Sequence, residues 1–168
     1  HLIGIILYME GLDCIGSDVR LLTALWELGV CGASLTWSRR NLLASGCCKA
    51  SECYEIRGGL SPEGFDVVRE MERLGMLVDV SHLNDDGFEN IRETAIRPFM
   101  ATHSNSREVS FHYRNLTDTQ MQILADQGGI AGLNGYVRLV SETAEEEYPD
   151  ENGVYCLEKL CMHWEDMV

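Results

Sequence analysis

Short apolar runs recur along the chain, and each is followed by a polar or aromatic residue. Runs of this length between turn residues are typical of buried strands. The segments between them carry apolar residues three and four positions apart, which is the spacing of one helix face. Strands that alternate with helices indicate βαβ units and a parallel sheet. We expect five strands, at Ile3–Met9, Val30–Leu35, Met76–Val80, Pro98–Ala101 and Ile130–Leu133.

Residues that commonly cap helices mark the boundaries of the expected helices. Ser17 suits the N-cap of the first helix, Ser61 precedes Pro62 at the start of the second, and Thr117 with Gln120 forms a capping-box pattern. We expect a single domain over residues 1–168, because no linker-like segment interrupts the pattern. The expected helices run from Ser17 to Leu28 (with Leu21, Leu22, Leu25 and Leu28 buried), from Pro62 to Leu74, from Asp86 to Thr94, from Thr117 to Gly128 and from Val154 to Met167.

The charge balance narrows the classes of partner. The 168 residues include 27 acidic and 13 basic side chains, for a net charge of −14. Nucleic acids and anionic membrane surfaces are therefore not expected as partners, because both need clustered Lys and Arg. The chain has no apolar run of the roughly 18 residues that a transmembrane helix requires. Since no signal peptide is visible either, we predict a cytoplasmic location.

Cysteine usage gives two alternative readings. The seven cysteines are odd in number and the chain can bury a sizeable core, so we expect reduced thiols rather than disulfides. Cys47, Cys48 and Cys53 could instead form a thiolate metal site, although no paired Cys-x-x-Cys frame accompanies them. The other cysteines are Cys14, Cys31, Cys156 and Cys161.

Chemically capable residues follow the ends of all five expected strands. The carboxyl ends of parallel strands meet at one face, so these side chains should converge on one rim. At a strand end, a lone carboxylate or histidine is often only structural, but two histidines on neighbouring strands about 4.8 Å apart can share one metal ion. Asp79, by alternation, should point to the face opposite His82 and be structural. The five residues are Glu10, Trp37, His82, His103 and Asn134.

Further candidates lie in the loops beyond the last two strands. Arg114 is either a solvated arginine in an acidic protein or a clamp for a substrate carboxylate, because its guanidinium fork matches two oxygens. His112 is interpreted as an ordinary loop residue. Trp37, Asn134, Tyr136 and Arg138 are expected to line the pocket.

Two long stretches closely resemble the membrane (renal) dipeptidase family of zinc peptidases, in its bacterial-type form. The resemblance covers nearly the whole chain, and the pairs Glu10-Gly11 and Thr36-Trp37 fit the same pattern. The stretches are GGLSPEGFDVVREMERLGMLVDVSHLN, from Gly58 to Asn84, and ATHSNSREVSFHYRNLTDTQMQILADQGGIAGLNGY, from Ala101 to Tyr136.

The resemblance implies an α/β fold, a (β/α)8 TIM-type barrel with two zinc ions that cleaves dipeptides, including those with a C-terminal D-residue. Glu10 then corresponds to the carboxylate that bridges both zinc ions. His82 and His103 correspond to the histidines that complete one metal site. Arg114 corresponds to the arginine that holds the dipeptide carboxylate.

Three departures from the family pattern limit this expectation. No His-x-Asp motif precedes Glu10, the last-strand aspartate would lie beyond Val168, and Trp37 stands where many members carry a histidine that helps to hold the reacting carbonyl oxygen. We therefore expect only about strands three to seven of the barrel, at most one zinc, and no activity from this chain alone. A homo-oligomer or another polypeptide could close the barrel. The alternatives to a dipeptidase are a catalytically incomplete fragment that acts through assembly and another metallohydrolase chemistry such as deamination.

Overall fold

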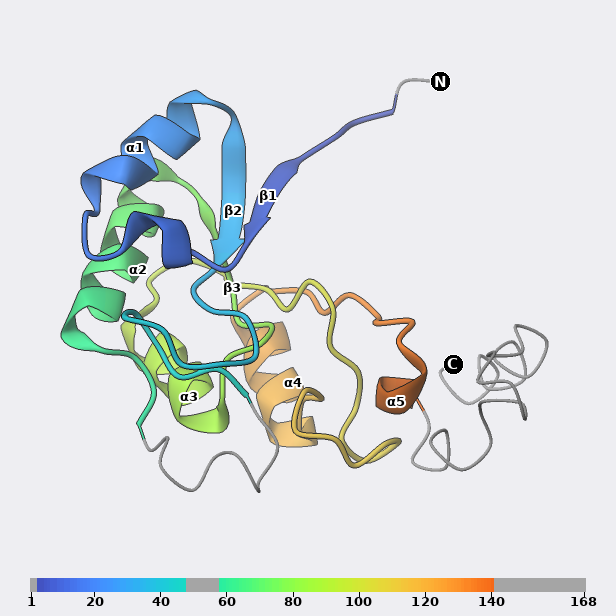
Figure 1. The fold of residues 1–168 in the computed structure, drawn as a ribbon. Coiled ribbons are helices and arrows are strands. Elements are labelled where there is room, and N and C mark those ends of the chain that lie inside the picture. The colour runs from blue at the N-terminus through green and yellow to red at the C-terminus, as the bar shows by residue number, and fades with distance from the viewer. Residues whose placement is uncertain (1–2, 48–57, 141–168) are drawn as a thin grey trace, which may run out of the picture.

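The computed structural model describes residues 3–47 and 58–140, which form a parallel sheet with helices packed against it (Figure 1). The three strands are hydrogen-bonded in the order β1-β2-β3, and both pairings are parallel. This arrangement confirms the predicted α/β class with parallel strands. The strands are β1 (Leu7–Glu10), β2 (Val30–Ser34) and β3 (Leu77–Asp79).

The fourth and fifth predicted strands appear only as single parallel bridges. Met100 bridges to Asp79 of β3, and Ala101 bridges to Ala131. Pro98 cannot donate a ladder hydrogen bond, which shortens the pairing of the fourth segment. In the described part of the chain no further strand lies beyond Ala131, so the fifth segment has a ladder partner on one side only. The parallel pairing of neighbouring segments therefore continues past β3, but each pairing is a single bridge and not a strand.

The first strand is shorter than predicted. It begins at Leu7 instead of Ile3, and Ile3, Ile5 and Ile6 are 91%, 84% and 68% exposed. Leu7 pairs with Val30, the first residue of β2, so β2 offers no partner to the residues before Leu7. These residues extend away from the body of the molecule in Figure 1.

In the described ranges, four helices of eight or more residues cover the sheet, and α1 and α2 lie along the same side of β1 and β2 (Figure 1). The predicted helices at Pro62, Asp86 and Thr117 are confirmed within one or two residues at most ends. The predicted helix Val154–Met167 lies outside the described residues. The elements are α1 (Arg20–Glu27), α2 (Pro62–Leu74), α3 (Asp85–Thr94) and α4 (Asp118–Asp126), with a 3-10 turn η1 (Asp13–Ile15) and a short, unpredicted helix α5 (Val137–Val140).

Side-chain caps explain where three of the helices begin. Ser61, Asn84 and Thr117 each accept a hydrogen bond from a backbone N–H three residues ahead, at distances of 3.0, 2.8 and 3.2 Å. At Thr117 the reciprocal bond from Gln120 is also present, so the predicted capping box is confirmed. Helix α2 ends at Gly75, whose positive φ of 80° suits a glycine.

The predicted start of the first helix was wrong. Ser17 is not its N-cap, because α1 begins at Arg20 and Val19 holds the N-cap position without a side-chain bond. Asp18 instead accepts the Arg20 N–H at 3.1 Å and pairs with the Arg20 guanidinium. The buried stripe is also narrower than expected, because Leu21 and Leu28 are 43% and 74% exposed.

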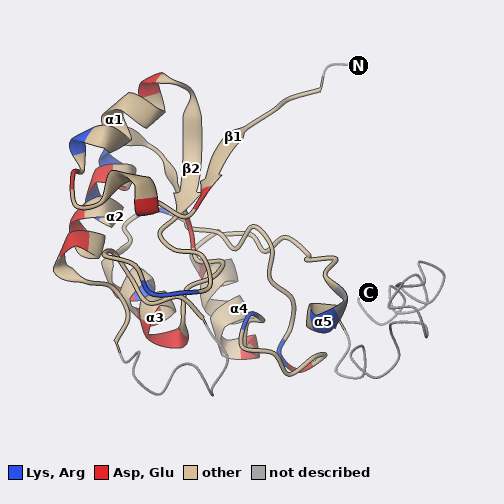
Figure 2. Cartoon of the chain, viewed as in Figure 1, with Lys and Arg blue, Asp and Glu red and all other residues tan. Residues whose placement is uncertain are grey.

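One hydrophobic core lies between the sheet and the helices. Helices α2 and α3 contribute Val67, Val68, Met71, Phe88 and Ile91 to this core, and most of its other buried residues come from the segments that flank the helices and strands. Figure 2 shows acidic residues along α2 and α3. No helix in the described ranges combines the length and apolarity needed to cross a membrane. The largest fully buried apolar side chains are Phe99, Leu12, Leu22, Leu35, Leu43, Met71, Ile91, Val67 and Val68.

Two contacts of α2 fix the loops around it. A Cβ atom added to Gly64 would lie 2.1 Å from the carbonyl oxygen of Leu43, so only glycine permits this close approach. At the other end of α2, the Glu72 carboxylate is 6% exposed and accepts the N–H groups of Ile96 and Arg97 at 2.8 and 2.9 Å. These bonds attach the segment after α3 to α2.

Candidate metal centre

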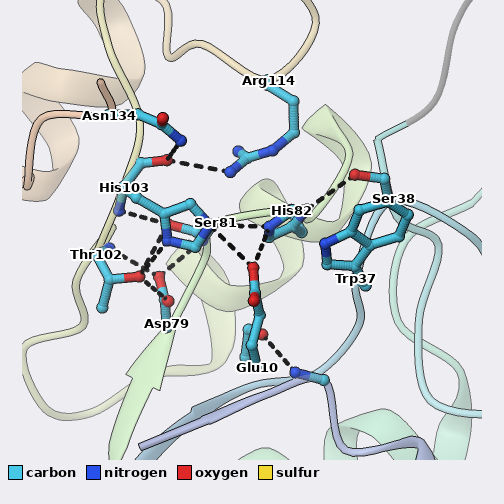
Figure 3. Close-up of polar contacts among 12 residues, drawn as sticks. Glu10, Trp37, Ser38, Asp79, Ser81, His82, Thr102, His103, Arg114 and Asn134 are labelled. Atoms are coloured by element: carbon cyan, nitrogen blue, oxygen red, sulfur yellow. Dashed lines mark hydrogen bonds and ion pairs between the residues drawn. The ribbon is translucent and has the colours of Figure 1, made fainter. Parts of the chain in front are cut away.

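Three predicted ligands converge at the carboxyl end of the sheet (Figure 3). The Nε2 atom of His82 lies 2.7 Å from Glu10 Oε1 and 2.8 Å from His103 Nε2. His103 Nε2 lies 3.2 Å from the same Glu10 oxygen. Of the His, Cys, Asp and Glu side chains that the structure describes, these three form the one group with donor atoms close enough to share an ion. The structure therefore brings together the three residues that the sequence singled out as candidate ligands.

The sheet positions the three side chains. Glu10 is the last residue of β1, His82 follows β3 by three residues, and His103 follows the bridge at Ala101. His82 has a φ of 73°, which is uncommon for a residue with a Cβ. Its carbonyl oxygen accepts the Cys47 N–H at 2.7 Å, and this bond helps to hold the turn.

A hydroxyl group lies beside the second ring nitrogen of each histidine. His82 Nδ1 is 2.8 Å from Ser38 Oγ, and His103 Nδ1 is 2.7 Å from Thr102 Oγ1. Hydrogen bonds to the outer nitrogen of an imidazole orient it as a metal ligand. Both rings consequently present Nε2 toward Glu10.

The orientation expected for Asp79 was wrong. The strand ends at Asp79, and His82 sits in a left-handed turn, so the alternation of a strand does not extend from one residue to the other. Asp79 is fully buried and accepts the hydroxyl protons of Tyr8 and Thr102, each at 2.5 Å. It therefore lies beneath the three ligands, on the same side of the sheet. Burial, followed by the charge of Asp79, raises the pKa of Tyr8.

The protonation state of His82 suits metal binding. Burial, followed by the positive charge of Arg114 and then His103, lowers the pKa of His82 to about 3. Its imidazole is therefore neutral at neutral pH, as a metal ligand must be. Two imidazole nitrogens and a carboxylate oxygen lie within 3.2 Å of one another, and their lone pairs repel unless a proton or a cation lies among them. This donor set fits zinc, which binds nitrogen and oxygen ligands.

Arg114 lies above the ligands and is 8% exposed. It donates from Nη2 to the carbonyl oxygen of His103 at 3.1 Å and from Nη1 to Ser104 Oγ at 3.4 Å. These bonds use two of its five N–H donors. The guanidinium lines the same cavity as Glu10 and the two histidines.

A cavity of about 570 Å³ opens over the ligands. Trp37 lies beside His82, with ring centroids 5.6 Å apart, and Asn134 donates to the carbonyl oxygen of His103 at 3.4 Å. The predicted pocket residues therefore surround one space. His112, interpreted from the sequence as a loop residue only, also lines it. The cavity walls include Trp37, Ser38, Arg39, His112, Tyr113, Asn134, Tyr136 and Arg138.

The sequence did not identify Ser38, Thr102 or Tyr8 as part of this region. Thr102 had a signal, because a hydroxyl residue directly before a strand-end histidine can bond its ring. Ser38 lies 44 positions from His82, so no local pattern relates the two.

The structure does not support a thiolate site within its described ranges. Cys14, Cys31 and Cys47 are free, and Cys48, Cys53, Cys156 and Cys161 lie outside these ranges. Burial raises the pKa of Cys47 to about 11, which disfavours the thiolate that binds metals.

Solved structures share this architecture. A metallo peptidase from Rhodobacter sphaeroides, bound to a phosphinate mimic of the dipeptide L-Ala-D-Ala, superposes with a TM-score of 0.76 at 30% identity, over 96% of this chain and 46% of that one. An amidohydrolase from Pseudomonas aeruginosa superposes with a TM-score of 0.73 at 26% identity, over 82% of this chain and 40% of that one.

Sequence comparison leads to the same family. Dipeptidase aclJ from Aspergillus oryzae is 36% identical over 133 residues, which are 78% of this chain and 30% of the relative. The chain spans less than half the length of the curated relatives and solved structures it matches. The model of the membrane dipeptidase family, peptidase family M19, matches residues 1–155. With nearly its whole length covered by that match, the chain belongs to the membrane dipeptidase family.

Proposed function

We propose that the protein is a metal-dependent dipeptidase when its barrel is complete, and that this chain supplies about strands three to seven of a (β/α)8 barrel. The observation that carries the proposal is the convergence of Glu10, His82 and His103, with donor atoms within 4.8 Å, beside a buried arginine. Membership of the dipeptidase family supports the same reaction.

Each residue has a defined role in the proposed site. His82 and His103 hold one metal ion through Nε2, and Glu10 binds it with a carboxylate that can also reach a second ion. When bound, zinc supplies a Lewis acid and an activated water for hydrolysis. Glu10, 45% exposed on its side chain, faces the cavity and is accessible to the substrate.

Arg114 is proposed to select dipeptides by their free carboxylate. Arg114 lines the cavity, and a guanidinium matches two carboxylate oxygens. A peptide with more than one residue after the scissile bond would place an amide where the carboxylate of a dipeptide binds. The solved structure of the Rhodobacter sphaeroides relative contains a mimic of the dipeptide L-Ala-D-Ala. This ligand supports the proposal that substrates of the present protein include dipeptides with a C-terminal D-residue. Trp37, Asn134 and Tyr136 would form the walls around the substrate.

The family resemblance also implies a second metal-ligand set and an aspartate that handles protons. Among the described residues the one ligand group is Glu10, His82 and His103, so we propose at most one zinc for this chain. Either a longer polypeptide or an assembled partner, including a second copy, would close the barrel. If neither exists, the alternative of a catalytically incomplete member that acts through assembly takes precedence.

The test is a comparison of hydrolysis by the longest natural form of the protein and by residues 1–168 alone. The longer form, loaded with zinc, should hydrolyse Ala–D-Ala, and the chain alone should stay near background. Glu10→Gln should abolish hydrolysis, whereas Glu108→Gln, at an exposed glutamate outside the cavity, should retain it. Deamination of a nucleobase without dipeptide hydrolysis would instead favour another metallohydrolase chemistry.

A further inference from the structure

Asp79 is the centre of a buried polar cluster directly beneath the metal ligands (Figure 3). Besides the hydroxyl groups of Tyr8 and Thr102, it accepts the backbone N–H of Ser81 at 2.8 Å and that of Thr102 at 3.0 Å. The bonds come from β1, from the end of β3 and from the segment that carries His103. A carboxylate is the side chain that can accept all of them, since its two oxygens have about four acceptor sites.

The hydroxyl of Thr102 has one hydrogen and two neighbours that could receive it. Asp79 Oδ2 lies at 2.5 Å and His103 Nδ1 at 2.7 Å, while Ser81 Oγ at 3.5 Å is too far to compete. If the hydrogen pointed to His103, two oxygens would lie 2.5 Å apart with no hydrogen between them. The hydrogen therefore points to Asp79, and Thr102 Oγ1 can only accept from His103.

This direction decides which nitrogen of His103 carries the proton. Nδ1 must donate to Thr102, so the lone pair of the neutral ring is on Nε2. That atom lies 3.2 Å from Glu10 Oε1. The His103 backbone is held as well, because its N–H donates to Ser81 Oγ at 3.1 Å. A neutral imidazole in water favours the other tautomer, with the proton on Nε2, so the protein must impose this one.

We propose that Asp79 is a positioning residue, which acts through the Thr102 hydroxyl to hold His103 in its Nδ1–H tautomer with the Nε2 lone pair toward Glu10. The inference deepens the proposed metal site and rests on it for its purpose. The tautomer itself can be observed without any metal.

The first test is the tautomer of His103 in the metal-free 168-residue chain. Long-range 1H–15N correlation spectra at about pH 7.5, with His103 assigned through His103→Gln, distinguish a protonated Nδ1 from a protonated Nε2. The expected result is Nδ1–H in the wild type and in Thr102→Ser, which keeps the hydroxyl. In Thr102→Val, which keeps the shape and removes the hydroxyl, the Nε2–H form should become dominant. A wild-type ring with its proton on Nε2, or the same tautomer in the wild type and Thr102→Val, would overturn the proposal.

The second test measures zinc affinity by competition with a chromophoric chelator. Thr102→Val and Asp79→Asn should weaken binding by about 10- to 100-fold, the usual effect of losing a partner of a metal ligand. Tyr8→Phe is the matched control, because it removes one hydrogen bond to Asp79 at the same 2.5 Å and leaves the Thr102 bond intact. An equal loss in all three variants would make Asp79 a structural residue only. If the tautomer behaves as expected but the wild type binds no zinc, the positioning of His103 stands and the proposed metal function fails.

Discussion

The hydroxyl oxygen of Ser38 lies 2.8 Å from Nδ1 of His82, and this contact joins the loop after β2 to the turn after β3. Ser38 does not touch Glu10 or His103 through any hydrogen bond among the described residues. Its hydrogen bond to the group of proposed ligands is therefore the one to His82. Removal of the Ser38 hydroxyl therefore measures how much the orientation of the His82 ring contributes to zinc affinity.

Ser38→Ala should weaken zinc binding by about 10-fold, because His82 loses the partner that orients its ring. Isothermal titration of the 168-residue chain would measure the change. Ser17→Ala is a suitable control, since Ser17 is an exposed serine away from the cavity. Equal affinities for the wild type and Ser38→Ala would show that the turn alone orients His82.

The chain should bind at most one zinc ion, and weakly, because Glu10, His82 and His103 are its only proposed ligands. His82→Ala and His103→Ala should each abolish binding. His112→Ala, which changes a histidine of the same cavity outside the ligand group, should not. Two tightly held zinc ions per chain by elemental analysis would contradict the incomplete site.

In the longest natural form of the protein, Arg114→Lys should keep the charge but lose the bidentate fork. We expect about 2–4 kcal/mol less transition-state stabilisation, or roughly a 30- to 1000-fold lower kcat/KM for a dipeptide. A dipeptide amide should be a poor substrate for the wild type and lose little further. If acid and amide substrates were affected equally, the clamp would be excluded and Arg114 would be a structural residue of its loop.

Gly64→Ala should destabilise the fold by about 2 kcal/mol or more, because the new methyl group would meet the Leu43 carbonyl oxygen. Chemical denaturation would give the difference in free energy of unfolding. Gly4→Ala is the control, since no atom lies within 4 Å of a Cβ added there. If both variants unfolded at the same denaturant concentration, the backbone around Leu43 would be able to move and accommodate the added methyl group.

The pair between Asp85 and Arg107 predicts a pH dependence of stability. The hydrogen bond from Arg107 holds the pKa of Asp85 below its ordinary value of 3.8, although burial opposes the shift. The ionised form is thus favoured in the folded state, so the pair stabilises at neutral pH and this contribution is lost as the pH falls below that value. Asp85 is 63% exposed, and the effect should stay under about 1 kcal/mol.

Denaturation at about pH 7 and pH 3 would check the sign. Asp85→Asn should lower the free energy of unfolding at the higher pH and change it little at the lower one. In an Arg107→Gln background the same substitution should have almost no pH-dependent effect. A loss of equal size at both pH values would assign the role of Asp85 to its bond with Gln120 instead.

The sequence indicated which side chains converge better than it indicated the lengths of the strands that carry them. Strand ends can be read locally, so Glu10, His82 and His103 were found together from apolar runs and their terminal residues. The lengths of strands depend on partners far along the chain. Ile3 to Ile6 are as apolar as a strand, yet β2 starts too late to pair with them.

The direction of Asp79 failed for a related reason. Side chains alternate between the two faces only while a strand continues. The positive φ of His82 changes the direction of the backbone after Val80, so alternation no longer predicts where the His82 side chain points. Histidine is enriched among non-glycine residues at positive φ, but such residues are uncommon overall, so the residue type alone does not predict this conformation. Capping signals, by contrast, were dependable at Ser61 and Thr117, because the capping hydroxyl and the backbone N–H that donates to it are three residues apart.

The three ligands are far apart in the sequence, and this spacing has a consequence for folding. Glu10 and His82 are 72 positions apart, and His82 and His103 are 21 apart. An ion bound to all three would act as a removable cross-link, and a covalent link around a loop of the longer length restricts the unfolded chain by about 4 kcal/mol. Metal concentration would then raise the melting temperature of the protein, and a chelator would loosen the ends of three strand segments at once.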